Sequence, residues 1–289
     1  MTWRILELFS GLGGWRWAAG ARGAVAAAYD ISPAANQAYA LNHGARPLTK
    51  ELATVPADAL ALHGADTWLL SPPCQPYCRM GNHRDLDDPR SQALVHLVGM
   101  ISPRQPERLA LENVEGFAGS RSHALLLDRL SAAGLQWREW CLCPTRFGIP
   151  NQRPRYFLAA ARAPLAVQEP PDTEPGEVGA YLDRDEDGAL YLSAAALQKH
   201  GPGLDLVTAE SRRTACFIGG YGRRYVGSGS FLRTARGVRR FSPAEIARLM
   251  GFPEPFAFPG GLSLEVRYKL LGNALNLDVA RWLLGAFSP

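Results

Sequence analysis

The stretch Leu8-Phe9-Ser10-Gly11-Leu12-Gly13-Gly14 closes the apolar run 4–9 and stands directly before a helical pattern. Glycines at such a turn let the backbone bend sharply and approach a ligand closely. Because cofactors bind at the carboxyl ends of strands in open α/β sheets, the turn is a candidate cofactor site. Its spacing differs from the nicotinamide fingerprint, which argues against a dehydrogenase. A plain strand–helix turn is the alternative.

The same alternation of apolar runs and helical patterns continues to residue 162. It predicts an α/β layered fold with a mostly parallel sheet. Strands are expected at 4–9, 25–29, 67–71, 108–112, 136–142 and 155–161, and helices at 14–20, 33–42, 91–101 and 123–133. Prolines then mark a linker at 163–176, and the segment 178–260 is irregular, glycine-rich and basic. Helical periodicity returns at 267–287.

The composition excludes several classes of protein. With 289 residues, 47% of them hydrophobic, the chain should be globular. It has no apolar run of about 18 residues and no signal-peptide pattern, so we expect no membrane span and a cytoplasmic location. Its five cysteines are an odd number, and their spacing matches no zinc ribbon. We therefore expect neither a disulfide framework nor a metal site.

The positive charge is concentrated in the last third of the chain. Residues 201–289 hold 12 basic and 6 acidic side chains, a net charge of +6, which leaves −2 for residues 1–200. Arginine predominates, and its guanidinium binds phosphate in a bidentate fork. This indicates a polyanionic partner, although an arginine-rich surface without a ligand explains the charge as well. The candidate phosphate contacts are Arg212, Arg213, Arg223, Arg224, Arg239 and Arg240.

A cysteine stands just after the apolar run Thr67–Leu70, in Ser71-Pro72-Pro73-Cys74-Gln75-Pro76. Two prolines fix the backbone and place the thiol at the carboxyl end of the expected strand. A lone cysteine is more often a small core residue. In this setting, however, Cys74 is a candidate nucleophile.

Charged residues mark two further strand ends. Glu112 follows the run Leu109–Leu111, where partial desolvation would raise its pKa and suit it to donate a proton. A loop or helix-capping carboxylate is the alternative. Arg153 and Arg155 alternate at the start of the strand expected at 155–161, and they could hold a carbonyl or orient a carboxylate.

In this order, the motifs resemble those of the cytosine-C5 methyltransferase family. The matching stretches run over nearly the whole chain: Phe9–Gly14, Ser71–Gln75, Leu111–Val114, Arg153–Arg155 and Leu271–Ala274. The resemblance implies a class I S-adenosylmethionine methyltransferase (Rossmann-like) sheet with a smaller target-recognition domain. The catalytic, cofactor-binding domain would comprise residues 1–163 and 267–289, and the target-recognition domain residues 164–266.

The resemblance also assigns roles. Cys74 would add to C6 of cytosine, and Glu112 would protonate N3. Arg153 and Arg155 would hold O2 and orient the Cys74 and Glu112 groups, and no metal would be needed. The cofactor would be S-adenosyl-L-methionine, in contact with Phe9, Gly11, Leu12, Gly13, Gly14, Asp30, Ile31, Leu52, Ala53, Ser71, Asn273 and Ala274. Asp30 is placed so that its carboxylate could accept hydrogen bonds from both ribose hydroxyls.

A further likeness is to the tRNA-aspartate cytosine-38 methyltransferases, the RNA-acting branch of this family. It is carried by Phe147–Asn151, Cys216–Ile218, Gly220–Gly222 and Ala247–Pro253. The chain departs from that branch in having Ile218 where threonine is expected, Ala274 where serine is usual, and Glu115 where the eukaryotic members tend to have lysine. The expected substrate is tRNA, methylated at cytosine 38 in the anticodon loop of tRNA-Asp or tRNA-Glu. A DNA methyltransferase of a restriction–modification system and an inactive nucleic-acid-binding relative are the alternatives, and a monomer is expected.

Overall fold

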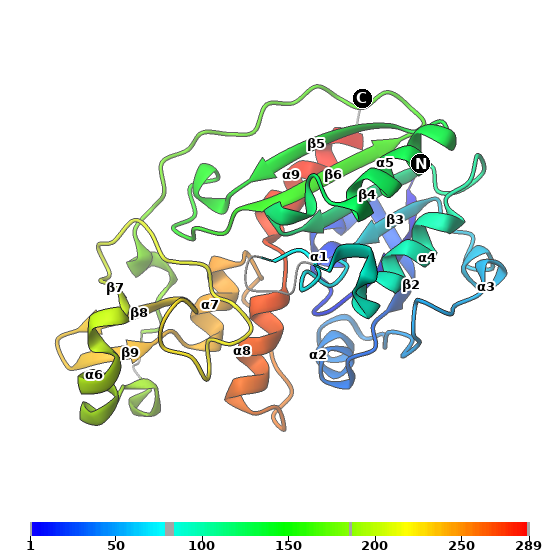
Figure 1. Cartoon of the computed structure of the whole chain (residues 1–289). Coiled ribbons are helices and arrows are strands. Elements are labelled where there is room, and N and C mark those ends of the chain that lie inside the picture. The colour runs from blue at the N-terminus through cyan, green and yellow to red at the C-terminus, as the bar shows by residue number, and fades with distance from the viewer. Residues whose placement is uncertain (1, 79–83, 185–186, 288–289) are drawn as a thin grey trace. The chain divides into compact units, whose positions relative to one another are not determined.

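The computed structural model describes residues 2–78, 84–184 and 187–287. Within them, six strands form one sheet in the order β2-β1-β3-β4-β6-β5 (Figure 1). The strands are β1 (Trp3–Leu8), β2 (Gly23–Tyr29), β3 (Thr67–Leu70), β4 (Arg108–Asn113), β5 (Gln136–Leu142) and β6 (Arg155–Ala161). The four strands β1 to β4 are parallel, and β6 pairs antiparallel with both β4 and β5. This arrangement confirms the expected α/β fold, with β6 inserted between its two predecessors.

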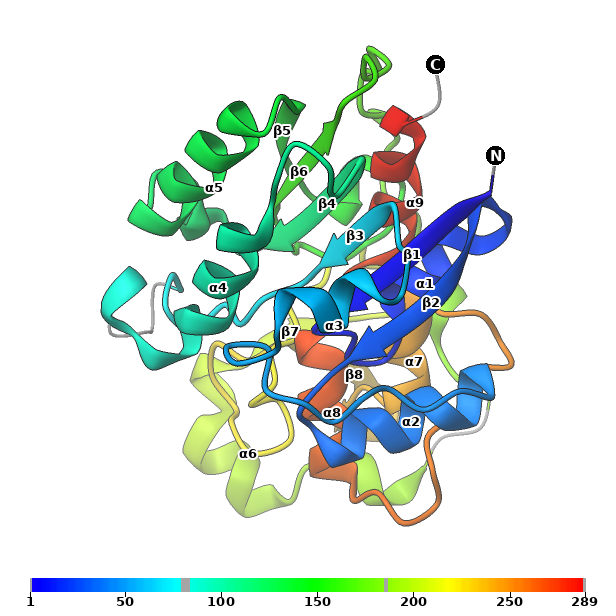
Figure 2. The same cartoon turned by 90° about the vertical axis from the view of Figure 1, so that its right-hand side faces the viewer.

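Helices cover both faces of this sheet (Figure 2). On one face, α3 (Ala57–Ala61), α4 (Gln92–Met100) and α5 (Arg121–Ala132) enclose a core that includes Trp68, Leu94 and Leu126. Helix α1 (Gly14–Ala19) and helix α9 (Leu277–Leu284) lie on the other face. The four residues of β3 are all buried, as expected for a central parallel strand that is covered on both sides.

Serine caps set where the helices begin. Ser32 accepts a hydrogen bond from the Ala35 N–H at the start of α2 (Pro33–His43), and Ser120 accepts one from the His123 N–H at the start of α5. Such caps satisfy backbone donors that have no partner inside the helix. For α2 and α5, these caps explain why the predicted helix starts agree with the structure to within two residues.

A second, smaller sheet has the order β7-β8-β9. Its elements are β7 (Asp205–Val207), β8 (Ser230–Thr234) and β9 (Gly237–Arg240), and the helices α6 (Ala194–His200), α7 (Pro243–Leu249) and α8 (Leu264–Asn273) belong to the same part of the chain. A buried cluster of aromatic rings around Tyr221 includes Phe217, Phe231 and Tyr268. Helix α7 begins with a capping box formed by Ser242 and Glu245.

The packing divides the chain into two compact units. The first comprises Met1–Leu142, Pro154–Glu169 and Val279–Pro289, and the second comprises Cys143–Arg153 and Pro170–Asp278. One passage between units falls in the proline-rich segment 163–176. The division into a catalytic domain and a target-recognition domain remains a prediction. The compact units differ from their bounds mainly in placing 143–153 and 267–278 in the second unit, because Asn151 and Arg153 hydrogen-bond to residues of that unit.

No helix of the described ranges is long and apolar enough to cross a membrane.

Candidate active site

The glycine-rich turn after β1 has an unusual backbone. Phe9, Gly11 and Gly13 all adopt positive φ angles, of 58°, 53° and 79°. Such angles cost glycine little, but they strain a residue with a side chain, so Phe9 is held there by its surroundings. The neighbouring N–H of Ser10 donates to the Tyr29 carbonyl at 2.9 Å, and the Gly13 N–H donates to the Ser10 carbonyl at 2.8 Å. The turn is therefore fixed to the end of β2.

Asp30 fixes the same turn through its side chain. One carboxylate oxygen accepts from the Gly11 N–H at 2.8 Å, and the other accepts from the Ser32 N–H at 2.7 Å. Burial raises the pKa of Asp30, and these two hydrogen bonds oppose the shift. Each oxygen keeps a lone pair for a further donor, so the geometry is compatible with the expected contact to a ribose.

The other residues of the first unit that are expected to contact the cofactor differ in their exposure and in what they pack against. Leu12, Gly13 and Gly14 are buried in or beside the turn, and Ile31 is 59% exposed. Leu52 is part of the hydrophobic core and Ala53 packs against it.

Ser71 connects the glycine-rich turn to the loop that carries Cys74. Its hydroxyl accepts a hydrogen bond from the indole N–H of Trp15, in α1, at 3.0 Å. Its backbone N–H donates to the Leu8 carbonyl at 3.3 Å. The end of β3 is therefore held against the helix that follows the glycine-rich turn.

The loop after β3 closes into one helical turn at Cys74. The Cys74 carbonyl accepts from the N–H groups of both Tyr77 and Cys78, each at 3.0 Å. Tyr77 is buried and packs edge to face on Phe117 at 5.0 Å. A side chain at Gly116 would lie 2.3 Å from the Tyr77 carbonyl oxygen, so glycine is required there. The turn is thus anchored at Tyr77, while the Cys74 side chain is half-buried.

Glu112 and Asn113 end β4 beside this loop. The side-chain amide of Asn113 donates to the Pro72 carbonyl at 3.2 Å, and its oxygen accepts from the Val114 N–H. Glu112 is 7% exposed, and its carboxylate lies 3.5 Å from Nε of Arg155, at the start of the adjacent strand β6. The structure therefore brings together three of the predicted elements: the Cys74 loop, Glu112 and Arg155.

Arg153 has a different set of partners. It is buried in the second unit, and its guanidinium donates to the carbonyls of Phe217, Gly272 and Ala274 at 3.0, 3.0 and 2.7 Å. It also lies 3.3 Å from the sulfur of Cys216. These contacts connect the segment 216–217 to the predicted cofactor residues Asn273 and Ala274. The catalytic role expected of Arg153 stays a prediction, and the contacts add a positioning role that the sequence did not indicate.

Glu7 is a site feature that the sequence analysis missed. It lies on β1, is fully buried, and accepts hydrogen bonds from the Tyr39 hydroxyl at 2.8 Å and the Arg16 N–H at 3.1 Å. Burial raises the pKa of this carboxyl to about 7. A charged residue directly before the stretch Leu8–Gly14 was the only signal available in the sequence.

Two of the six arginines that the sequence offers as candidate phosphate contacts are buried. Arg239 is 2% exposed and forms two hydrogen bonds to the buried Glu245 carboxylate, at 2.7 and 2.8 Å. Arg240 is also buried, and its guanidinium lies over the rings of Tyr221, Tyr225 and Phe231. Both charges therefore lie inside the second unit and are paired with its own groups. Of the others, Arg213 pairs with Asp205 and Arg223 with Glu265, whereas Arg212 and Arg224 are exposed.

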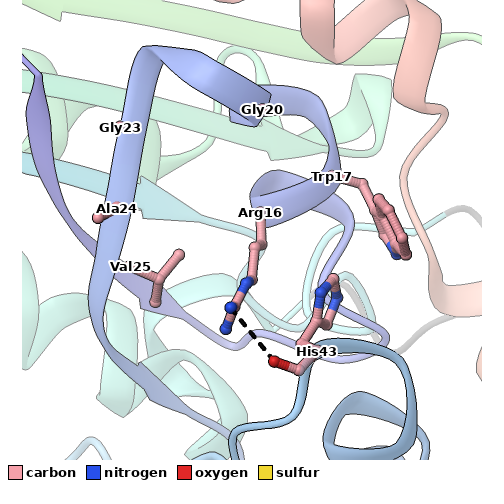
Figure 3. A pocket seen from close by; sticks show the side chains of 7 residues that line it. All are labelled: Arg16, Trp17, Gly20, Gly23, Ala24, Val25 and His43. Atoms are coloured by element: carbon pink, nitrogen blue, oxygen red, sulfur yellow. Dashed lines mark hydrogen bonds between the residues drawn. The ribbon is translucent and has the colours of Figure 1, made fainter.

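A pocket of about 430 Å³ lies behind the glycine-rich turn, lined by Arg16, Trp17, Gly20, Gly23, Ala24, Val25 and His43 (Figure 3). The Arg16 guanidinium donates to the His43 carbonyl at 3.3 Å. Burial, followed by the charge of Arg16, lowers the pKa of His43 to about 4. None of the predicted site residues lines this pocket. Among the described residues, no group of three or more histidine, cysteine or carboxylate side chains could hold a metal ion.

Comparison with known proteins identifies the family. The model of the C-5 cytosine-specific DNA methylases matches residues 3–187 and 196–288. The chain belongs to this family. A tRNA (cytosine(38)-C(5))-methyltransferase of Schizosaccharomyces pombe is 32% identical, over 97% of this chain and 95% of that one. A DNA (cytosine-5)-methyltransferase of Dictyostelium discoideum is 29% identical, over 97% and 93%. The structure of the Entamoeba histolytica methyltransferase EhMeth superposes with a TM-score of 0.92 at 26% identity, over 98% of this chain and 97% of that one.

This cytosine-C5 methyltransferase therefore has its family's motifs on the elements where the sequence placed them. The family consists of methyltransferases that generally use S-adenosylmethionine.

Proposed function

We propose that this enzyme methylates C5 of cytosine 38 in the anticodon loop of tRNA-Asp or tRNA-Glu, with S-adenosyl-L-methionine as the methyl donor. The main structural support for this chemistry is the hydrogen bond from Asn113 to Pro72. It holds the Cys74 loop beside the end of β4, where Glu112 lies. The likeness to the S. pombe tRNA methyltransferase, which covers nearly the full length of both chains, favours RNA over DNA.

The glycine-rich turn fits the proposed donor. A methyl group built on Gly11 meets no protein atom within 4 Å, so the space beside the turn is open to a ligand. Asp30 lies at the end of the adjacent strand with acceptor capacity remaining. Phe9, Leu12, Gly13, Gly14, Ile31, Leu52, Ala53, Ser71, Asn273 and Ala274 would complete the contacts. When bound, the sulfonium supplies an electrophilic methyl group.

The protein's own groups would make the cytosine reactive. The Cys74 thiolate adds to C6 and forms a C–S bond, which converts C5 into an enamine-like carbon. Glu112 donates a proton to N3 as negative charge develops on the ring. Arg155 keeps the Glu112 carboxyl oriented and can hold O2. After C5 is methylated, a base takes the C5 proton and the C–S bond breaks, which releases Cys74.

A loop substrate also lowers the energy needed to reach the thiol. A base that is paired in a duplex must leave its stack, which takes roughly a few kcal/mol. An unpaired base in an anticodon loop is already accessible to side chains, so less energy is needed. The smaller energy requirement favours an RNA loop over duplex DNA as the substrate.

Methyl transfer to defined nucleic acids tests the proposal. Labelled S-adenosyl-L-methionine should methylate a tRNA-Asp or tRNA-Glu transcript, and a transcript with uridine at position 38 should remain unlabelled. Cys74→Ala and Glu112→Gln should reduce the transfer by at least about a hundredfold. Labelling of duplex DNA with none of tRNA would replace the RNA proposal by the DNA alternative. Binding of tRNA and cofactor without turnover would show an inactive relative.

A further inference from the structure

The helical turn at Cys74 carries a second thiol. Because the Cys78 N–H donates to the Cys74 carbonyl at 3.0 Å, the two cysteines stand four residues apart on one helical turn. Side chains at such positions lie on the same face, with Cβ atoms about 5–6 Å apart. Both are half-buried, whereas Pro76 and Tyr77 between them are buried. The anchored side of the turn therefore faces the core, and both sulfurs lie on its partly exposed side.

A fixed positive charge lies within electrostatic range of both sulfurs. Arg90 is held by three hydrogen bonds to the buried Asp88 carboxylate: from its backbone N–H at 2.9 Å, from Nε at 2.8 Å and from a terminal nitrogen at 2.6 Å. These bonds raise the pKa of Arg90, and negative charge on Cys78 and Cys74 raises it further. Arg90, already paired with Asp88, thus interacts electrostatically with both sulfurs.

We propose that Cys74 and Cys78 form a reversible oxidative modification site, in which Cys78 traps the oxidised form of the nucleophile as a disulfide. The oxidant is a hydroperoxide. The Cys74 thiolate attacks the peroxide oxygen and becomes a sulfenic acid, and the peroxide is reduced to an alcohol or water. The Cys78 thiolate then attacks the Cys74 sulfur, the S–S bond forms, and hydroxide leaves and takes up a proton. A dithiol returns two electrons and restores both thiols.

The geometry makes this bridge labile. Across one helical turn, Cα atoms lie inside the range that disulfides span, but the Cβ separation exceeds the usual 3.5–4.5 Å or so by about 1–2 Å. The turn must tighten to close the bond, and such strained disulfides are easily reduced. The bridge would thus protect Cys74 from irreversible oxidation without removing it permanently. Only the effect on methyl transfer rests on the proposed function, because bridge formation does not depend on the substrate.

Peroxide treatment of the full chain tests the site. The reduced protein is treated with hydrogen peroxide, its remaining thiols are blocked with N-ethylmaleimide, and its intact mass and peptide map are measured. We expect a loss of two hydrogen atoms and a cross-linked peptide that joins Cys74 to Cys78. Methyl transfer should fall by about tenfold or more and return after dithiothreitol. A map that joins other cysteines, or a disulfide-linked dimer, would overturn the proposal.

Two sets of variants complete the test. Cys78→Ser and Cys78→Ala should retain methyl transfer when reduced. After brief peroxide treatment their Cys74 sulfenic acid should react with dimedone, and prolonged treatment should carry Cys74 to the sulfinic acid, with a loss of activity that dithiothreitol cannot restore. Cys141→Ser removes an exposed thiol elsewhere and should form the bridge like the wild type. Equal dimedone labelling of Cys74 in wild type and Cys78→Ser would exclude a trapping role. If the reduced wild type does not methylate tRNA, the proposed function fails, while the peptide map still decides this inference.

Discussion

The side-chain amide of Asn113 donates to the carbonyl of Pro72, two residues before Cys74, at 3.2 Å. The bond is buried, and it joins the end of β4 to the loop after β3 at the point where each carries a proposed catalytic group. Hydrogen bonds within a strand or turn could not fix this distance, because the two segments are 41 residues apart in the sequence.

The first prediction concerns this bond. Asn113→Asp keeps an oxygen for the Val114 N–H but cannot donate to the Pro72 carbonyl when ionised. A buried carbonyl that loses its donor destabilises the fold by about 1–3 kcal/mol, so urea unfolding should show a loss of this size. The rate of methyl transfer should fall by more than the loss of folded protein explains. The decrease should appear in kcat. An unchanged kcat would show that the Cys74 loop keeps its position without Asn113.

The second prediction concerns pH. Glu7 has a pKa of about 7 in the folded protein, against an ordinary value of 4.5, so between these pH values the folded state binds more protons than the unfolded chain. Its contribution to stability therefore decreases as the pH rises from about 5 to 7, by about 3 kcal/mol in total, and is constant above that interval. Glu7→Gln should remove this dependence and be more stable than the wild type at pH 8.

Urea unfolding of the wild type and of Glu7→Gln at several pH values measures the difference in their free energies of unfolding. The other titratable groups are the same in both proteins, so the pH dependence of this difference reports on Glu7. A difference that does not vary with pH would show that Glu7 does not titrate in this interval.

The third prediction separates two glycines of the same turn. Gly11 and Gly13 both have positive φ, but a Cβ on Gly11 meets open space and one on Gly13 would lie 2.2 Å from Nε2 of His43. Gly11→Ala should lose only about 1–2 kcal/mol of stability from backbone strain, whereas Gly13→Ala should lose more. His43→Ala should restore part of the loss at Gly13 and none at Gly11, as measured by thermal unfolding. Equal effects in both backgrounds would contradict the predicted clash.

The fourth prediction compares a buried ion pair with an exposed one. Glu245→Gln leaves the Arg239 charge inside the second unit without its carboxylate, which should reduce the free energy of unfolding by about 3–5 kcal/mol. Glu265→Gln breaks the exposed pair with Arg223 and should change the free energy of unfolding by no more than about 1 kcal/mol. Similar losses in the two variants would show that burial does not determine the strength of these pairs.

Most elements of the first unit were predictable because each has a local cause, whereas the short helix α3 (Ala57–Ala61) was not predicted. Apolar runs of four to seven residues, glycine turns and serine caps set their bounds, and β1 ends at Leu8, one residue early, because Phe9 adopts a positive φ. The insertion of β6 between β4 and β5 depends on pairing between distant segments, and no local pattern indicates it.

The sequence also located the Cys74 loop and Glu112, because the carboxyl ends of parallel strands meet at one edge. Arg155, at the start of β6, reaches Glu112 because β6 runs antiparallel to β4, which the sequence did not indicate. It did not distinguish surface charge from buried charge. Arg239 and Glu245 pair across six residues, and the burial of Arg240 depends on the aromatic rings around it. The partners of Arg153 lie 63 to 121 residues away, so its contacts follow only from the tertiary structure.

The order in which the two units alternate along the chain has a consequence for synthesis. The first unit includes the segment from Val279 onward, and Trp282 in α9 packs against Trp140 of β5 at 5.4 Å between ring centroids. A ribosome that has translated all six strands must still make the second unit before this helix emerges. During that interval a nascent chain presents Trp140 and its neighbours uncovered, and no single cut in the gene would separate one unit from the other.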